Sequence, residues 1–133
     1  MSKKMIGPEM LPALQGVIPS IIGTCSATGI PNVTYISQVY YVDVSHVALS
    51  YQFFNKTIHN IRENPVSCVY ATCPVNYVLY KCMLRYVRSQ ASGEIFEEMS
   101  MQLEAIASVQ GKTGVFKLQA ADIYEVLSVE KII

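Results

Sequence analysis

The sequence predicts a mainly β domain, in which six or seven antiparallel strands close into a small barrel with flanking helices. Three observations favour this fold class. Segments rich in β-branched and aromatic residues recur along the chain, short turns join the first three of them, and three helical patterns interrupt the series. With 133 residues the chain has the usual length of one domain, so we expect residues 1–133 to form a single domain.

The N-terminal half predicts one short helix and three strands. Residues 8–16 begin with proline and end with glycine, which are typical helix start and stop signals. Strands are expected over residues 20–27 and 32–42, with a Gly–Ile–Pro turn between them. Residues 47–52 then return as the hairpin partner of the second strand.

The remaining elements alternate between helices and strands. Residues 54–64 predict a helix that Pro65 ends, and strands follow over residues 66–72 and 77–89. Residues 94–110 predict the longest helix, because apolar side chains recur there at intervals of three and four. The last two strands are expected over residues 115–118 and 123–129.

Composition excludes some classes of protein. Hydrophobic residues make up 51% and charged residues only 15%, which excludes intrinsic disorder. Ten basic and ten acidic residues cancel, which argues against a nucleic-acid partner. Residues 1–93 carry seven basic and three acidic side chains, and the rest carry the reverse. An anionic ligand is therefore expected against the strands and the middle helix, although an acidic, solvent-facing last helix would explain half of this asymmetry.

Addressing signals and metal ligands are both sparse in the sequence. No apolar stretch has the roughly 18–20 residues of a membrane span, and prolines interrupt the N-terminal segment where a signal peptide would be apolar, so we expect a cytoplasmic protein without a membrane partner. The four cysteines contain no Cys-x-x-Cys pair and no histidine lies near them in sequence, so no metal site is predicted: they are Cys25, Cys68, Cys73 and Cys82.

The most informative segment is residues 50–65, where a strand ends and an Asn55–Lys56–Thr57 cluster begins a short helix. Helix starts bind phosphate readily, because their first N–H groups have no partner within the helix. Lys56 adds positive charge, and Asn55 and Thr57 add hydrogen-bond donors. The alternative interpretation is that Asn55 only caps the helix and Lys56 is solvated.

Three segments in this order resemble the pyridoxamine 5′-phosphate oxidase-like family of FMN-binding split barrels. They are the Cys-Ser-Ala-Thr-Gly-Ile-Pro-Asn-Val turn at residues 25–33, the Phe-Phe-Asn-Lys-Thr pattern that leads to Asn-Pro at residues 53–65, and the Leu-Arg-Tyr-Val-Arg strand that runs into Gly93. The resemblance extends from about residue 11 to residue 132. It implies an FMN-binding split barrel that forms a homodimer, with the cofactor between the subunits.

The resemblance also implies roles for particular residues. Basic and hydroxyl residues hold the flavin phosphate, residues of the second strand line the isoalloxazine ring largely through their backbone, and the end of the third strand flanks the ribityl chain. The second subunit completes the site from its long strand. The residues that match the phosphate-binding positions are Asn55, Lys56 and Thr57, and those that match the ring-lining positions are Tyr35, Ile36, Ser37 and Gln38. Ser50 and Tyr51 match the positions beside the ribityl chain, and Arg85 matches the position that the second subunit contributes.

Two departures from the family pattern concern the reaction. Thr34 stands where the oxidases carry an arginine, and the sequence ends at Ile133 without the Arg- and His-bearing segment that binds their substrate. We therefore expect a flavin-dependent oxidoreductase of unknown substrate, reduced by a nicotinamide or another small molecule, with no assigned catalytic side chain. The alternatives are a non-catalytic flavin sensor or carrier and a haem- or deazaflavin-binding barrel. The Asn-Lys-Thr cluster favours FMN over haem.

Overall fold

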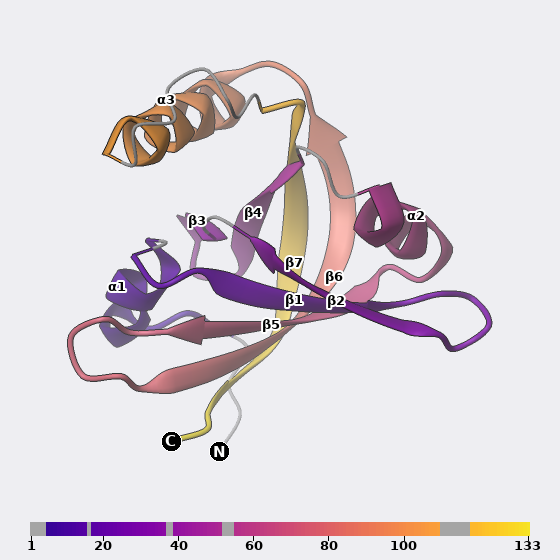
Figure 1. The fold of residues 1–133 in the computed structure, drawn as a ribbon, viewed down its shortest axis with the longest axis horizontal. Coiled ribbons are helices and arrows are strands. Elements are labelled where there is room, and N and C mark those ends of the chain that lie inside the picture. The colour runs from indigo at the N-terminus through magenta and orange to yellow at the C-terminus, as the bar shows by residue number, and fades with distance from the viewer. Residues whose placement is uncertain (1–4, 16, 37–38, 52–54, 110–117) are drawn as a thin grey trace.

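The computed structural model describes residues 5–15, 17–36, 39–51, 55–109 and 118–133 (Figure 1). Its strands are built from β-branched and aromatic residues, as the sequence predicts. The elements, in chain order, are η1 (Pro8–Met10, a 3-10 turn), α1 (Leu11–Leu14), β1 (Ser20–Cys25), β2 (Pro31–Ile36), β3 (Val39–Asp43), β4 (His46–Tyr51), α2 (Asn55–Glu63), β5 (Val66–Thr72), β6 (Leu79–Gln90), α3 (Glu94–Val109) and β7 (Ala120–Lys131).

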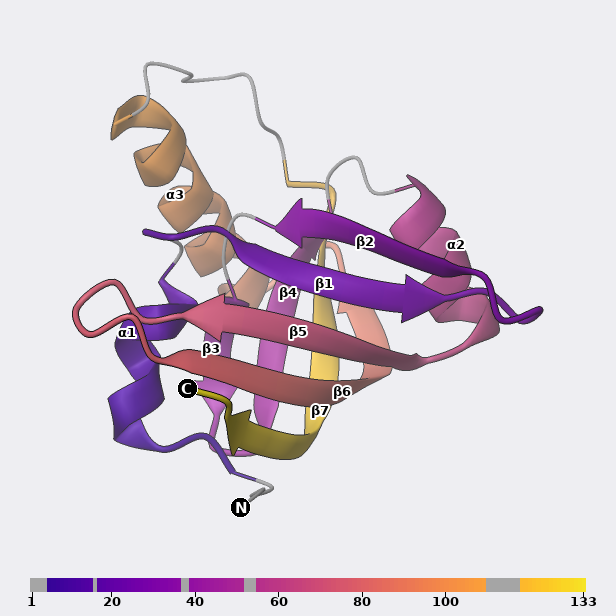
Figure 2. The ribbon, with the colours of Figure 1, turned by 60° about the horizontal axis from the view of Figure 1, so that its bottom comes forward.

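The described strands form one seven-stranded antiparallel sheet in the order β2-β1-β5-β6-β7-β4-β3. Strands β2 and β3 lie at its two opposite edges, yet Ile36 and Val39 are only three residues apart in the chain. Three Cα steps span at most about 11 Å, so the sheet must curl until its edges approach each other. Figure 2 shows this curl. The predicted fold class, a split antiparallel barrel with flanking helices, is therefore confirmed.

The prediction of one continuous strand over residues 32–42 is wrong. The structure has two strands there, β2 and β3, on opposite edges of the sheet, and residues 37–38 between them lie outside the described part. The division has a physical reason, since a single strand cannot pair with β1 at one edge and with β4 at the other.

The C-terminal strands also differ from the prediction. One twelve-residue strand, β7, replaces the shorter strand predicted over residues 123–129, and it pairs with both β6 and β4. Residues 115–117 of the other predicted strand lie outside the described part, and Leu118 precedes β7. The remaining predicted elements agree with the structure to within a few residues at each end.

The barrel interior holds the larger hydrophobic core. Strand β1 alternates between buried and half-buried residues, so that Ile22 points inward and is only 1% exposed. Met10 and Leu14 pack into the same core beside the strands, and Ile61 of α2 joins it from the other side. Gly29 makes the tight β1–β2 turn with a φ of +87°, a conformation that favours glycine.

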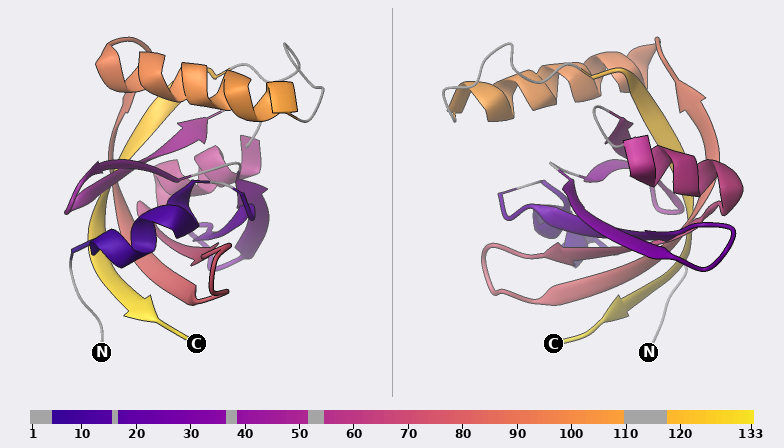
Figure 3. Two further views of the ribbon diagram at one scale, coloured as in Figure 1. Left: turned by 90° about the vertical axis from the view of Figure 1, so that its left-hand side faces the viewer. Right: turned by 45° about the vertical axis from the view of Figure 1, so that its right-hand side comes forward.

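A second, smaller core lies outside the barrel, beneath α3. Met99 and Leu103 of this helix are buried against Ala48 of β4 and Ile123 of β7. Figure 3 shows α3 across one end of the barrel. Strand β7 thus has one face in each core, which explains why the five residues from Ala120 to Tyr124 are all buried.

Candidate functional site

Helix α2 begins at Asn55, soon after β4 ends at Tyr51, and ends at Glu63 before Pro65. Its first turn therefore contains the predicted phosphate-binding cluster. Thr57 in this turn is only 4% exposed. The side chains of Tyr51, Asn55 and Lys56 lie outside the described set, and so do residues 52–54.

Hydrogen bonds attach α2 to the β1–β2 hairpin. Near the helix start, the Asn32 amide of β2 donates to the Thr57 hydroxyl at 3.3 Å. In the middle, the buried Asn60 amide donates to Thr24 Oγ1 at 3.2 Å. At the helix end, a Glu63 carboxylate oxygen accepts from the backbone N–H of Ala27 at 3.0 Å. The first turn of α2 is thereby held beside β2.

The predicted residues of β2 point in two directions. Tyr35 is 67% exposed on the outer face of the sheet, whereas Ile36 is 3% exposed and belongs to the barrel core. Successive residues of a strand face opposite sides, so the two side chains do not share a surface. Ser37 and Gln38 lie outside the described residues.

The other predicted residues fall at opposite ends of α2. Ser50 is buried and pairs with Ala121, and the backbone of Tyr51 pairs with Ala120, so both lie just before the helix start. Arg85 is exposed and pairs with Val66, which follows the helix end. The structure therefore gathers Ser50, Tyr51 and residues 55–57 within one chain and leaves Arg85 apart from them.

Sequence reasoning missed Asn32 as a site residue. The sequence offered one usable signal, because Asn32 and Thr34 alternate along a predicted strand and so share one face. In the structure both are half-buried, in contrast to the exposed Val33 and Tyr35. The face of β2 toward α2 therefore carries polar side chains.

A small pocket of about 200 Å³ lies beside α2, and we name it the Asp122 pocket. Ser89 donates to the Asp122 carboxylate at 2.5 Å, and the Tyr86 and Ser89 hydroxyl oxygens are 2.7 Å apart. Since the single proton of Ser89 points to Asp122, Tyr86 must donate to Ser89. The pocket is lined by Ile58, Ile61, Arg62, Tyr86, Ser89, Ala120 and Asp122.

Burial raises the pKa of Asp122 above its ordinary value of 3.8, although the Ser89 hydrogen bond and the charge of Arg62 lower it. A carboxyl whose pKa is raised in the folded protein contributes most to stability at a pH below the pKa that it has in the unfolded chain. That contribution is lost as the pH rises through the folded pKa.

Asp122→Asn removes this titration while keeping an acceptor for Ser89. We expect the free energy of unfolding of the variant to rise relative to that of the parent as the pH increases from about 3 to about 7. Urea unfolding at several pH values measures the difference. A difference that stays constant or falls with pH would contradict this assignment.

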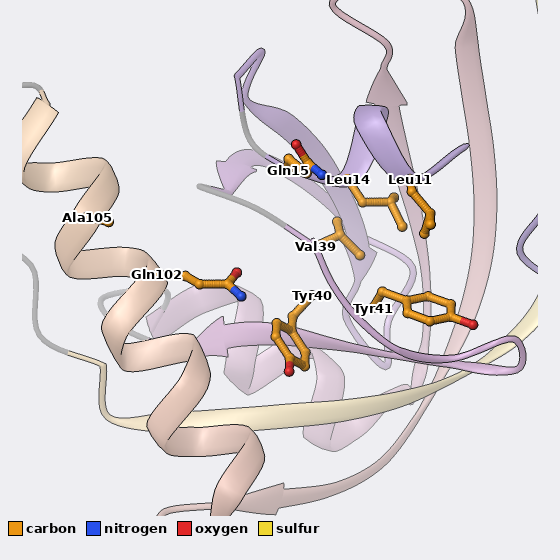
Figure 4. Close-up of a pocket in the computed structure, with 8 residues that line it drawn as sticks. All are labelled: Leu11, Leu14, Gln15, Val39, Tyr40, Tyr41, Gln102 and Ala105. Atoms are coloured by element: carbon orange, nitrogen blue, oxygen red, sulfur yellow. The ribbon is translucent and has the colours of Figure 1, made fainter. Parts of the chain in front are cut away.

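A larger cleft of about 540 Å³ separates α1, β3 and α3. Figure 4 shows Gln102 and Ala105 of α3 on one side of it, facing β3 and α1. The Tyr40 hydroxyl donates to Glu98 at 2.6 Å, and burial raises the pKa of Tyr40 to about 12. The cleft has the size of a small-molecule site. Its β3 wall starts at Val39, directly after the predicted ring-lining residues 37–38.

Two absences hold for the described part of the chain. It contains no helix that is both long and apolar enough to cross a membrane. It also contains no cluster of three histidine, cysteine or acidic side chains arranged to hold a metal ion.

The curled sheet and the helix start held against its edge strand define a small split barrel of the kind found in FMN-binding proteins. The family model described as pyridoxamine 5′-phosphate oxidase matches residues 6–127, and the chain belongs to this family. A search of curated protein sequences found no match.

Several solved structures are similar to this chain in fold. An FMN-binding protein from Syntrophomonas wolfei has a TM-score of 0.78 and 14% identity over 94% of this chain and 85% of its own. An F420 reductase has a TM-score of 0.65 and 10% identity over 89% of this chain and 93% of its own. HutZ, the heme storage protein from Vibrio cholerae, has a TM-score of 0.57 and 14% identity over 93% of this chain and 92% of its own. These identities establish the fold alone.

Proposed function

We propose that this chain is a cytoplasmic FMN-binding protein that acts as a flavin-dependent oxidoreductase, with the flavin phosphate bound at the first turn of α2. The observation that carries the proposal is this turn, which follows β4 and is held beside β2 by the Asn32–Thr57 hydrogen bond. The family match supports flavin as the cofactor.

The groups at the start of α2 suit a phosphate. The first N–H groups of a helix have no acceptor within the helix, and they lie at the positive end of its dipole. Thr57 and Asn32 add a hydroxyl and an amide, and Lys56 adds a positive charge to the same turn of the sequence. Hydrogen-bond donors and a positive charge together suit a phosphate dianion, whose oxygens accept hydrogen bonds and carry negative charge.

The residues of this chain would bind and orient the cofactor. Asn60 and Glu63 keep α2 on the β1–β2 hairpin through their hydrogen bonds to Thr24 and Ala27, so the phosphate-binding turn is preorganised. When bound, a flavin supplies hydride or electron transfer through its isoalloxazine ring. We assign no general acid or base to this chain.

We propose further that the chain forms a homodimer through the outer face of β2, β1 and β5. Val33 and Tyr35 of β2 are 68% and 67% exposed. Ile21 of β1 lies opposite Tyr35, and Tyr70 of β5 lies opposite Ile21, so the three side chains form an apolar row. Exposed apolar patches of this kind mark interaction surfaces. A second copy would cover the row and would bring its own Arg85 to the assembly.

Anaerobic reduction tests whether the protein is an enzyme or a flavin carrier. The FMN-loaded protein is mixed with NADH or NADPH, and the visible absorbance of the bound flavin is followed. We expect one nicotinamide to bleach the flavin and air to restore its colour. A bound flavin that neither nicotinamide reduces would favour the carrier or sensor over the oxidoreductase.

A further inference from the structure

The Asp122 pocket contains a preorganised negative charge. Asp122 is 3% exposed, and its carboxylate accepts a hydrogen bond from the Ser89 hydroxyl. The Ser89 hydroxyl oxygen in turn accepts a hydrogen bond from the Tyr86 hydroxyl. The Tyr86 ring packs edge-on against Tyr124, with the ring centres 5.6 Å apart, and this contact fixes the start of the hydrogen-bond chain. The Tyr86 and Ser89 hydroxyls thus both donate in the direction of Asp122.

This charge has no direct counter-ion among the described residues. No lysine, arginine or histidine nitrogen in that part of the chain lies within 4.0 Å of Asp122. Burial of a carboxylate without a paired cation is costly, and this cost raises the pKa of Asp122. A ligand that brings a positive nitrogen to Asp122 would remove the cost.

Arg62 gives the same pocket a positive side. Its side chain is exposed on the last turn of α2, lines the pocket, and acts electrostatically on Asp122. A ligand that is only a cation would be repelled by Arg62, and one that is only an anion would be repelled by Asp122. The pocket therefore complements a molecule that carries both charges at separate ends.

The remaining walls and the size limit such a molecule. Ile58, Ile61 and Ala120 offer apolar surface. The pocket of about 200 Å³ is smaller than the roughly 300–1,000 Å³ of sites for drug-sized ligands, so only a small molecule fits it. This corresponds to a short aliphatic chain with a polar group at each end.

We infer that the Asp122 pocket binds a small zwitterion of the amino-acid class. Its ammonium group donates to the Asp122 carboxylate, its short chain lies against Ile58 and Ile61, and its carboxylate accepts from Arg62. The pocket borders the proposed flavin site, because Ala120 pairs with Tyr51 and Ile58 follows Thr57, but none of its lining residues is one of the predicted flavin-site residues. It does not depend on the proposed flavin.

Binding of three probes to the full chain tests the inference. Glycine, β-alanine and γ-aminobutyrate are titrated separately at neutral pH, and binding is followed by the amide chemical shifts of the ¹⁵N-labelled protein. The zwitterion that binds most tightly is compared with the amine and the carboxylate of the same chain length. We expect it to bind at least about tenfold more tightly than either, with shifts centred on Arg62, Ser89 and Asp122.

Three variants assign the charges. Asp122→Asn should weaken zwitterion binding at least about tenfold, and Arg62→Gln should remove the preference for the zwitterion over the matched amine. Glu130→Gln, which removes an exposed acid on β7 away from the pocket, should leave binding unchanged. The amide spectrum reports whether each variant is folded.

The inference is overturned if no zwitterion binds more tightly than its matched amine and carboxylate, or if folded Asp122→Asn binds it as well as the parent. The titrations are run without flavin, and FMN binding is measured separately. Failure of this inference is therefore distinguishable from failure of the proposed flavin site.

Discussion

Lys56→Glu should weaken FMN binding at least about tenfold and as much as about 150-fold. A hydrogen bond to a charged group contributes about 1.5–3 kcal/mol, and the substitution also places a carboxylate beside the phosphate. Lys56 lies in the first turn of α2, one residue before the buried Thr57. Quenching of flavin fluorescence in an equilibrium titration measures the dissociation constant of parent and variant.

Lys131→Glu is the matched control, because it reverses the same charge at an exposed position at the end of β7. Its FMN affinity should equal that of the parent. Equal affinities for parent and Lys56→Glu, with both proteins folded by circular dichroism, would show that Lys56 does not face the phosphate.

Val33→Glu should convert the proposed homodimer into a monomer. Val33 is 68% exposed in one chain, so the substitution leaves the core of that chain unchanged. In the proposed dimer it would bury a carboxylate in an apolar interface, which costs several kcal/mol and raises the dissociation constant at least about 100-fold. Light scattering during size-exclusion chromatography measures the molar mass.

The control for this substitution is Val75→Glu, at a residue that is 79% exposed in the β5–β6 turn. It introduces the same charge away from the outer face of β2, β1 and β5, and it should remain a dimer. A parent protein that is monomeric at every concentration would contradict the dimer. A dimeric Val33→Glu would place the interface on another surface.

Local patterns predict most elements of this fold. Pro65 stops α2, and the apolar spacing of Met99 and Leu103 places α3 correctly. The break between β2 and β3 was missed, because residues 32–42 are uniformly rich in strand-forming side chains. What separates Ile36 from Val39 is their pairing with β1 and β4, and such long-range pairing has no local signature.

The candidate site also has a part that the sequence predicts and a part that only the folded structure reveals. The Asn55–Lys56–Thr57 cluster is contiguous, so the sequence alone indicates a phosphate site. The partner Asn32 is 25 residues from Thr57 along the chain, and only the folded hairpin brings them together.

The Asp122 pocket was also missed, for a related reason. Asp122 and Ser89 come from β7 and β6, and their contact depends on the register between these strands. In the sequence, Asp122 is a single acid between two alanines and an isoleucine, which reveals neither its burial nor its hydrogen bond.

Paired titrations with FMN and riboflavin test whether this chain binds FMN through its phosphate. Riboflavin has the same ring system and lacks the phosphate. We expect saturable binding of one FMN per chain, and at least about tenfold weaker binding of riboflavin. No saturable FMN binding, or equal affinity for the two flavins, would contradict it.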